Sequence, residues 1–289
     1  MDNGNIAVEN GPTRLHHKAV GSGRPAILFI HGYGGDARHW RHQIEALSRV
    51  TSCVSFDLRG HGRSRSFLTG CNIEVAANDA LAVSQEVAGK SPMVVVGHSM
   101  GARIALQVAM TAPNRVSELV LVDGSCAPDD PKAIARGAEQ EISRLGYEQF
   151  ARKTLNGYLV DQLPAKDQRS LLASNLLLDP KVAITYLASM AQWDGQGFDA
   201  ATAGVQAKVT VLQSTSLAED TSLPRFRIAE LATSRWLDAW SRQAQAYIKR
   251  VPNAGHYTML EDPAVVTNAI QNAFLSASPV KDWEIRSKA

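Results

Sequence analysis

The stretch MVVVGHSMGARIALQVAM, residues 93–110, decides the fold of this chain. A short apolar run ends at Gly97, and an alanine-rich helical pattern begins after Ser99. The G-x-S-x-G pattern between them, residues 97–101, is typical of a serine held on a sharp turn from a strand into a helix. Small neighbours are needed there because larger side chains would meet the adjoining strand and helix. The stretch therefore predicts a buried strand, a serine whose Oγ atom projects into a cleft, and a helix whose N-terminus favours an oxyanion.

Apolar runs and helical patterns alternate outward from this stretch. The runs are continuous rather than alternating, as expected for strands buried on both faces of a parallel sheet. The predicted strands are AILFIH (26–31), TSCVSFD (51–57), MVVVG (93–97), ELVLVD (118–123), KVTVLQ (208–213) and AYIKRV (246–251). Helical patterns occur near residues 38–49, 75–89, 100–112 and 263–275. The alternation predicts an α/β fold with a doubly wound, mostly parallel central sheet.

A long segment without a strand pattern separates the predicted strands at 118–123 and 208–213. It reads as several helices, and an insertion of this length at the carboxyl end of a strand lies over the edge where α/β sheets bind ligands. We expect a helical cap subdomain at 125–206. The core is then formed by residues 1–124 and 207–289.

Composition and charge exclude several classes of protein. The 289 residues carry a formal net charge of +2 without a basic run, which gives no reason to expect nucleic acid as a partner. The three cysteines lack metal-type spacing, so we expect thiols in a reducing compartment. No apolar stretch reaches the ~18–20 residues of a membrane span, and the first residues lack a signal-peptide pattern. We therefore expect a cytoplasmic protein without a membrane partner.

Two further segments follow predicted strands and carry histidines. HGYGG, residues 31–35, comes directly after the first strand, and its glycines allow the backbone to turn an N–H group inward. We expect the amides of Tyr33 and Met100 to be the two donors of an oxyanion hole. NAGH, residues 253–256, follows the last strand, and His256 is the best placed of the eight histidines to reach the serine.

Other histidines and nearby charges receive structural interpretations. His31 is expected to brace its loop by hydrogen bonding. His98 is expected to point away from the cleft, because it adjoins the serine. In DLRGHGRS, residues 57–64, we expect Asp57 and Arg59 to form a local salt-bridged turn.

Taken together, these segments resemble the α/β-hydrolase fold family with a helical cap. HGYGG, DLRGHGRS, GHSMG, LVLVD and NAGHYTMLEDP match motifs of that family in order, over roughly residues 25–278. The resemblance implies Ser99 as nucleophile, His256 as general base and acid, and an acidic residue between them in the chain. It also implies that no cofactor is needed. We expect a small-molecule substrate and no metal, and the oligomeric state, monomer or homodimer, stays open.

The acidic residue has more than one possible source. Family members usually carry it in a G-x-x-D-x-x-x-P pattern after the strand that here is KVTVLQ, but this loop lacks the glycine and places Glu219 and Asp220 slightly late. A second family variant takes the acid from the end of the preceding strand, where this chain has Asp123. We favour Asp123, with Asp220 and Glu219 as alternatives. Arg225 and Arg227, in the same loop, are assigned no role.

The predicted function is that of a serine hydrolase. It would cleave a carboxylic ester or related acyl bond of a small, largely apolar molecule through an acyl-enzyme. Alternatives on the same site are a C–C bond hydrolase, a lactonase, a thioesterase or a perhydrolase. A biosynthetic acyltransferase or cyclase and a ligand-binding receptor are further alternatives. Epoxide hydrolysis and dehalogenation are disfavoured, since they require a carboxylate at the position of Ser99.

Overall fold

A mixed sheet of eight strands forms the centre of the molecule. The computed structural model describes residues 5–7, 14–65, 68–127, 129–160, 163–217 and 224–277. The sheet has the strand order β1-β2-β4-β3-β5-β6-β7-β10. Its strands are β1 (Asn5–Ala7), β2 (Arg14–Val20), β3 (Ile27–Ile30), β4 (Cys53–Phe56), β5 (Met93–His98), β6 (Val116–Val122), β7 (Lys208–Gln213) and β10 (Ala246–Arg250).

Pairing in the sheet is parallel from β4 to β10, and β2 is antiparallel to both β1 and β4. The mostly parallel sheet predicted from the apolar runs is therefore confirmed. Strands β1 and β2, the antiparallel strands at the edge, were not among the predicted strands. The sequence of β2, RLHHKAV, alternates between buried and more exposed positions, so it lacks the continuous apolar run of the inner strands.

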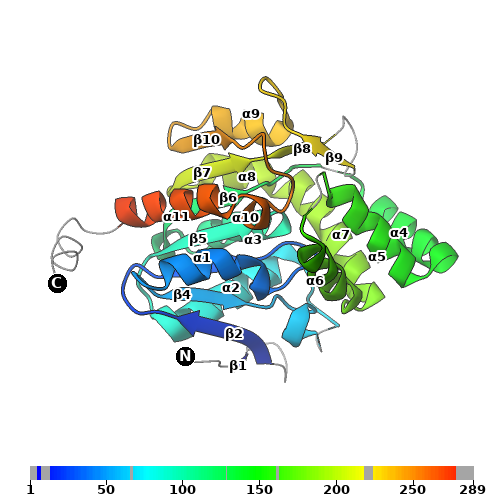
Figure 1. Ribbon diagram of the computed structural model, residues 1–289, viewed down its shortest axis with the longest axis horizontal. Helices are drawn as coiled ribbons and strands as arrows, with labels where there is room; N and C mark the ends of the chain where they lie inside the picture. The colour runs from blue at the N-terminus through cyan, green and yellow to red at the C-terminus, as the bar shows by residue number, and fades with distance from the viewer. Residues whose placement is uncertain are drawn as a thin grey trace.

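Helices cover both faces of the sheet (Figure 1). On one face α1 (Arg41–Leu47) packs against α11 (Pro263–Ala277), and on the other α2 (Ile73–Ala88) packs against α3 (Met100–Thr111). These four helices confirm the helical patterns predicted outside the insertion. Shorter helices are α9 (Arg235–Ser241), α10 (Thr258–Glu261) and three 3-10 turns at Ala37–Trp40, Gly62–Ser64 and Pro113–Arg115.

Among the described residues between β6 and β7, five helices are present. They are α4 (Pro131–Leu145), α5 (Tyr147–Tyr158), α6 (Ala165–Leu176), α7 (Pro180–Gln196) and α8 (Phe198–Gly204). Asp130 and Asp179 cap α4 and α7 by accepting backbone N–H groups, and each is followed by a proline, which suits the first turn of a helix. Figure 1 shows α4 to α7 together at one side of the sheet, whereas α8 packs against α3.

A small two-stranded sheet follows β7 directly. It consists of β8 (Thr215–Leu217) and β9 (Arg225–Arg227), paired antiparallel with Leu217 opposite Arg225. Among the described residues no single helix is long and apolar enough to cross a membrane. Helices α6 and α7, which meet at an angle of 98°, satisfy that requirement of length and composition only as a pair.

Candidate active site

Ser99 lies on a strained turn between β5 and α3. Its backbone has φ 54° and ψ −114°, and positive φ is uncommon for residues other than glycine. A Cβ atom on Gly97 would lie 2.2 Å from the carbonyl oxygen of Gly101, and one on Gly101 would lie 2.4 Å from that of Ile30. Both glycines are therefore required by the close approach of β5, α3 and β3. The sharp turn expected from the G-x-S-x-G pattern is present.

Asp123 and His256 meet at the carboxyl ends of their strands. Asp123 directly follows β6, has φ 46° and is fully buried. Its Oδ2 atom accepts a hydrogen bond of 2.7 Å from Nδ1 of His256, which lies in the loop between β10 and α10. Of the three acidic residues considered above, the structure brings Asp123 to the histidine. Glu219 and Asp220 lie outside the described residues.

The segment after β7 surrounds the Asp123 carboxylate with donors. Oδ1 accepts hydrogen bonds from the backbone N–H groups of Ser214 and Thr215, at 2.9 and 2.8 Å, and from the side chains of Ser214 and Gln213. Oδ2 accepts a bond of 2.5 Å from the Thr215 hydroxyl and one of 3.1 Å from Nη1 of Arg225. This number of donors stabilises the ionised carboxylate.

Arg225 is a residue of the site to which the sequence pattern assigned no role. It is buried and forms an ion pair with Asp123, whereas Arg227, two residues later, is exposed. Strand alternation places both arginines on the same face of β9, so the difference in burial arises from the surroundings of each position along the strand. A single sequence offers no signal that separates the two, because β9 is too short to show a periodicity.

Electrostatic effects in the site favour an ionised acid and a neutral histidine. Burial alone would disfavour the Asp123 carboxylate, but the hydrogen bond from His256 and the charge of Arg225 hold the pKa of Asp123 well below its ordinary value. Burial and then the charge of Arg225 lower the pKa of His256 to about 4, although Asp123 acts in the opposite direction. With its proton on Nδ1, a neutral imidazole has Nε2 available to accept a proton.

The His256 ring is held between other rings. The Nε2–H group of His98 donates a hydrogen bond of 2.8 Å to the carbonyl oxygen of His256, and the two ring centroids are 4.6 Å apart. On another side the ring of Tyr158, from α5, stacks on His256 with centroids 4.9 Å apart. The structural interpretation of His98 is supported, since its side chain holds the His256 loop by a hydrogen bond.

The HGYGG turn lies close to Ser99. A Cβ atom on Gly32 would come within 3.2 Å of the Ser99 Cβ, so the glycine permits this approach. Tyr33 follows Gly32 in the same turn. Met100 is the first residue of α3, and the N–H groups of a first turn have no acceptor within the helix. The backbone thus places both amides expected to be oxyanion donors in segments that adjoin the serine.

His31 braces this turn as expected. Its Nδ1–H donates to the carbonyl oxygen of Gly32 at 2.8 Å, and its Nε2 accepts the N–H of Leu58 at 3.0 Å. One ring nitrogen donates and the other accepts, so the imidazole is neutral, in agreement with the lowering of its pKa by burial.

The expected pairing of Asp57 with Arg59 is wrong. Arg59 forms a buried ion pair with Asp79 of α2, at 2.7 Å, while Asp57 accepts the backbone N–H groups of Ala37 and Arg63. The helix that packs over the segment supplies a closer carboxylate than the neighbour in sequence, and this tertiary contact is not visible in the local pattern.

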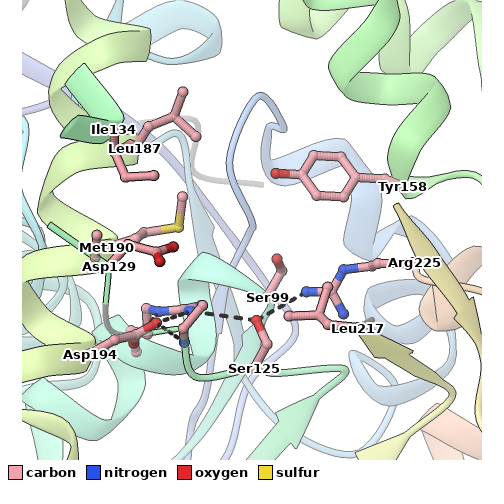
Figure 2. A pocket seen from close by; sticks show the side chains of 13 residues that line it. Ser99, Ser125, Asp129, Ile134, Tyr158, Leu187, Met190, Asp194, Leu217 and Arg225 are labelled. Carbon is pink, nitrogen blue, oxygen red and sulfur yellow. Dashed lines mark hydrogen bonds and ion pairs between the residues drawn. The ribbon is translucent and has the colours of Figure 1, made fainter. Parts of the chain in front are cut away.

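Ser99 lines a pocket bounded by the helices between β6 and β7 (Figure 2). The pocket encloses about 570 Å³ of empty space, including its opening to solvent. Its polar lining consists of Ser99, Arg103, Ser125, Asp129, Asp194 and Arg225. Apolar side chains and one ring complete it, namely Ala127, Ile134, Tyr158, Leu187, Met190, Ala191 and Leu217.

Two arginines converge at the base of this pocket. Nη2 of Arg103 and Nη2 of Arg225 both donate to the hydroxyl oxygen of Ser125, at 3.4 and 3.1 Å (Figure 2). Arg103 also forms a two-bond ion pair with Asp194 of α7, at 2.7 and 2.6 Å. Among the described residues, no three His, Cys, Asp or Glu side chains are arranged to hold a metal ion.

Known proteins resemble the chain in sequence and in fold. Residues 27–269 match the model of the alpha/beta hydrolase family. A dihydrolipoyllysine-residue acetyltransferase component of an acetoin cleaving system, from Cupriavidus necator, is 38% identical over 109 residues, which are 38% of this chain and 29% of that protein. A putative carbamate hydrolase, RutD, from Azorhizobium caulinodans is 36% identical over 119 residues, which are 41% of this chain and 44% of that protein.

The structural comparison extends over nearly the whole chain. A thermophilic esterase from Thermogutta terrifontis, solved with malate bound, has a TM-score of 0.77 at 21% identity, and the match covers 96% of this chain and all of that one. The sequence matches, by contrast, span less than half of the length of these curated relatives. The family model covers most of the chain, and the sheet order and the serine turn agree with it. The chain belongs to the alpha/beta hydrolase family.

Proposed function

We propose that this protein is a serine hydrolase that cleaves an ester or related acyl bond of a small molecule. Ser99 is the nucleophile, His256 the general base and acid, and Asp123 the acid of the triad. The observation that carries the proposal is the 2.7 Å hydrogen bond from His256 to a fully buried Asp123, in the site that also holds the strained Ser99 turn. The esterase fold of the T. terrifontis protein agrees with this assignment.

The proposed reaction proceeds in two halves. The hydroxyl oxygen of Ser99 attacks the substrate carbonyl carbon while Nε2 of His256 accepts its proton, and Asp123 stabilises the imidazolium that forms. The amides of Tyr33 and Met100 bind the oxyanion, and each such donor is worth about 2.7–4 kcal/mol. His256 then gives its proton to the leaving alcohol. Water, activated by the same histidine, releases the acid and regenerates Ser99.

The pocket lining supports a small and largely apolar substrate. Ile134 of α4 and Leu187, Met190 and Ala191 of α7 form an apolar wall opposite the polar base. We propose that residues 125–206 act as a cap that brings this wall over Ser99 and restricts the length of the acyl or alcohol group. A cytoplasmic location, the absence of a cofactor and a monomeric or homodimeric state remain predictions.

The test is hydrolysis of p-nitrophenyl esters from acetate to long acyl chains, with an aryl carbamate added because one relative is a putative carbamate hydrolase. Wild-type protein is compared with Ser99→Ala and with Ser241→Ala, a control at an exposed serine. We expect activity to disappear in Ser99→Ala and to persist in Ser241→Ala. Hydrolysis by Ser99→Ala at the wild-type rate would refute the assignment of Ser99 as the nucleophile. No wild-type hydrolysis of any substrate would favour a narrow-specificity enzyme, a transferase or a receptor.

A further inference from the structure

A guanidinium group lies on the same carboxylate oxygen as the histidine. Nη1 of Arg225 is 3.1 Å from Oδ2 of Asp123, the atom that also accepts the hydrogen bond from His256. The same Nη1 donates to the Thr215 hydroxyl at 2.9 Å, and Nη2 donates to the Ser125 hydroxyl at 3.1 Å. These bonds hold a buried guanidinium in one orientation at the edge of the pocket (Figure 2).

A buried carboxylate is stabilised by a permanent counter-charge in addition to its hydrogen-bond donors. Asp123 is fully buried, and a neutral His256 supplies a hydrogen bond but no charge. An unpaired charge in such a position is costly, so the carboxylate would otherwise take a proton or draw one onto the histidine. Within the described part of the chain, Arg225 is the permanent cation bonded to Asp123. It therefore meets the need for charge balance before the reaction begins.

The position of Arg225 in the chain is consistent with this role. In the family that the chain resembles, the loop after β7 usually carries the acid itself. Here the acid is at the end of β6, and the segment after β7 provides donors to it, from Ser214, Thr215 and Arg225. The segment after β7 thus acts on His256 through Asp123 instead of supplying the acidic residue itself.

We propose that Arg225 is a positioning residue for the acid–histidine pair, which keeps Asp123 ionised and oriented toward His256 while His256 remains neutral and able to accept the Ser99 proton. This inference rests on the proposed function and deepens it. Arg225 acts through Asp123 and is not assigned contact with the reacting atoms.

The charge of Arg225 also acts on His256 directly. Titratable and charged groups face His256 from several elements, namely Asp123 after β6, Arg225 on β9, Arg103 on α3, His98 on β5, Tyr158 on α5 and the adjacent Tyr257. After burial, Arg225 is the largest influence that lowers the pKa of His256, and Asp123 opposes it. Loss of the Arg225 charge should therefore make His256 easier to protonate.

The experiment measures the protonation of His256 in the resting protein by two-dimensional ¹H–¹⁵N NMR of the imidazole groups, with His256→Gln used for assignment. Wild type is compared with Arg225→Gln, with Arg225→Lys, and with Arg227→Gln as the control. Arg227 is on the same strand but exposed, and its Nη1 bonds the carbonyl oxygen of Pro252. Where an ester is hydrolysed, the acid limb of the kcat/KM profile is recorded in parallel.

We expect the protonation midpoint of His256 to rise by about one pH unit or more in Arg225→Gln, a tenfold change in proton affinity. It should stay near the wild-type value in Arg225→Lys and Arg227→Gln. An unchanged midpoint in Arg225→Gln would overturn the inference. If that variant does not fold, a midpoint raised to the ordinary histidine value in folded Arg225→Lys would overturn it as well. The NMR result does not require turnover, so it is independent of a failure to hydrolyse esters.

Discussion

Nδ1 of His256 lies 2.7 Å from Oδ2 of Asp123, although 133 residues separate the two in the chain. The parallel sheet explains this contact. Asp123 follows β6 and His256 follows β10, and both strands pair with β7. Since parallel strands end at one edge of the sheet, the two side chains project from neighbouring carboxyl ends. The segment after β7, the strand between β6 and β10, supplies further hydrogen-bond donors to the Asp123 carboxylate.

Asp123→Asn should reduce kcat by about 10⁴-fold, because an amide cannot hold the Nδ1–H form of His256 or stabilise its cation. Asp220→Asn and Glu219→Gln should leave kcat within about threefold of wild type, as expected for changes outside the triad. Ester hydrolysis by the three variants at neutral pH makes the comparison. Near-normal activity in Asp123→Asn together with a large loss in Asp220→Asn would show that Asp220, and not Asp123, is the acidic residue of the triad.

Gly97→Ala should destabilise the protein by about 1–3 kcal/mol and lower its activity, because the new Cβ would lie 2.2 Å from a backbone oxygen at the start of α3. Gly137→Ala in α4 is the matched control. A Cβ atom there meets no other atom within 4 Å, so the change should stabilise the helix by about 0.5–1 kcal/mol. Urea denaturation measures both. Equal effects of the two substitutions would show that the serine turn is not sterically constrained.

Asp194→Asn should cost about 3–5 kcal/mol in the free energy of unfolding, because it leaves the buried Arg103 without its carboxylate. The pair joins α3 to α7, so the loss should also weaken the attachment of α7 to the core. Glu148→Gln, which removes an exposed ion pair with Arg152 in α5, should change stability by less than about 1 kcal/mol. A small effect of Asp194→Asn in thermal or urea unfolding would contradict this expectation.

Stability should fall as the pH decreases from about 6.5 toward 5. Burial is the main cause that lowers the pKa of five buried histidines, which are His31, His39, His61, His98 and His256. Below the ordinary pKa the unfolded chain binds protons that the folded chain does not. Each such histidine therefore contributes at most about 1.4 kcal/mol of lost stability per pH unit in that window.

The urea midpoint measured at pH 7.5, 6 and 5 checks this dependence. Sodium acetate and phosphate buffers of equal ionic strength keep the screening of surface charges constant. A change in the urea midpoint then reports proton binding. A midpoint that stays constant from pH 7.5 to pH 5 would show that these histidines accept protons without unfolding.

Much of the fold could be predicted from the sequence because the inner strands are unambiguous. Runs such as VVV at 94–96 and LVLV at 119–122 are buried on both faces, as is typical of strands inside a parallel sheet. The glycines around Ser99 predicted the turn for a similarly local reason, since a Cβ atom on either would meet backbone atoms. Asp123 could be named as an acid because strand ends share one edge.

Other features depended on contacts that no local pattern encodes. Arg59 binds Asp79, twenty residues later, rather than its near neighbour Asp57, because α2 packs over that segment. Arg225 reaches Asp123 across 102 residues, whereas Arg227, of the same residue type and two positions later, is exposed. In both cases the choice of partner is made by the packing of elements distant in the chain.

The most direct test of the proposed mechanism is covalent labelling of the nucleophile. Wild type and Ser99→Ala are incubated with an aryl alkylphosphonate ester, and the intact mass and the modified peptide are determined. We expect one phosphonyl group per wild-type chain, located on Ser99, and none on the Ser99→Ala variant. Modification of a different residue, or equal modification of both proteins, would contradict the assignment of Ser99 as the nucleophile.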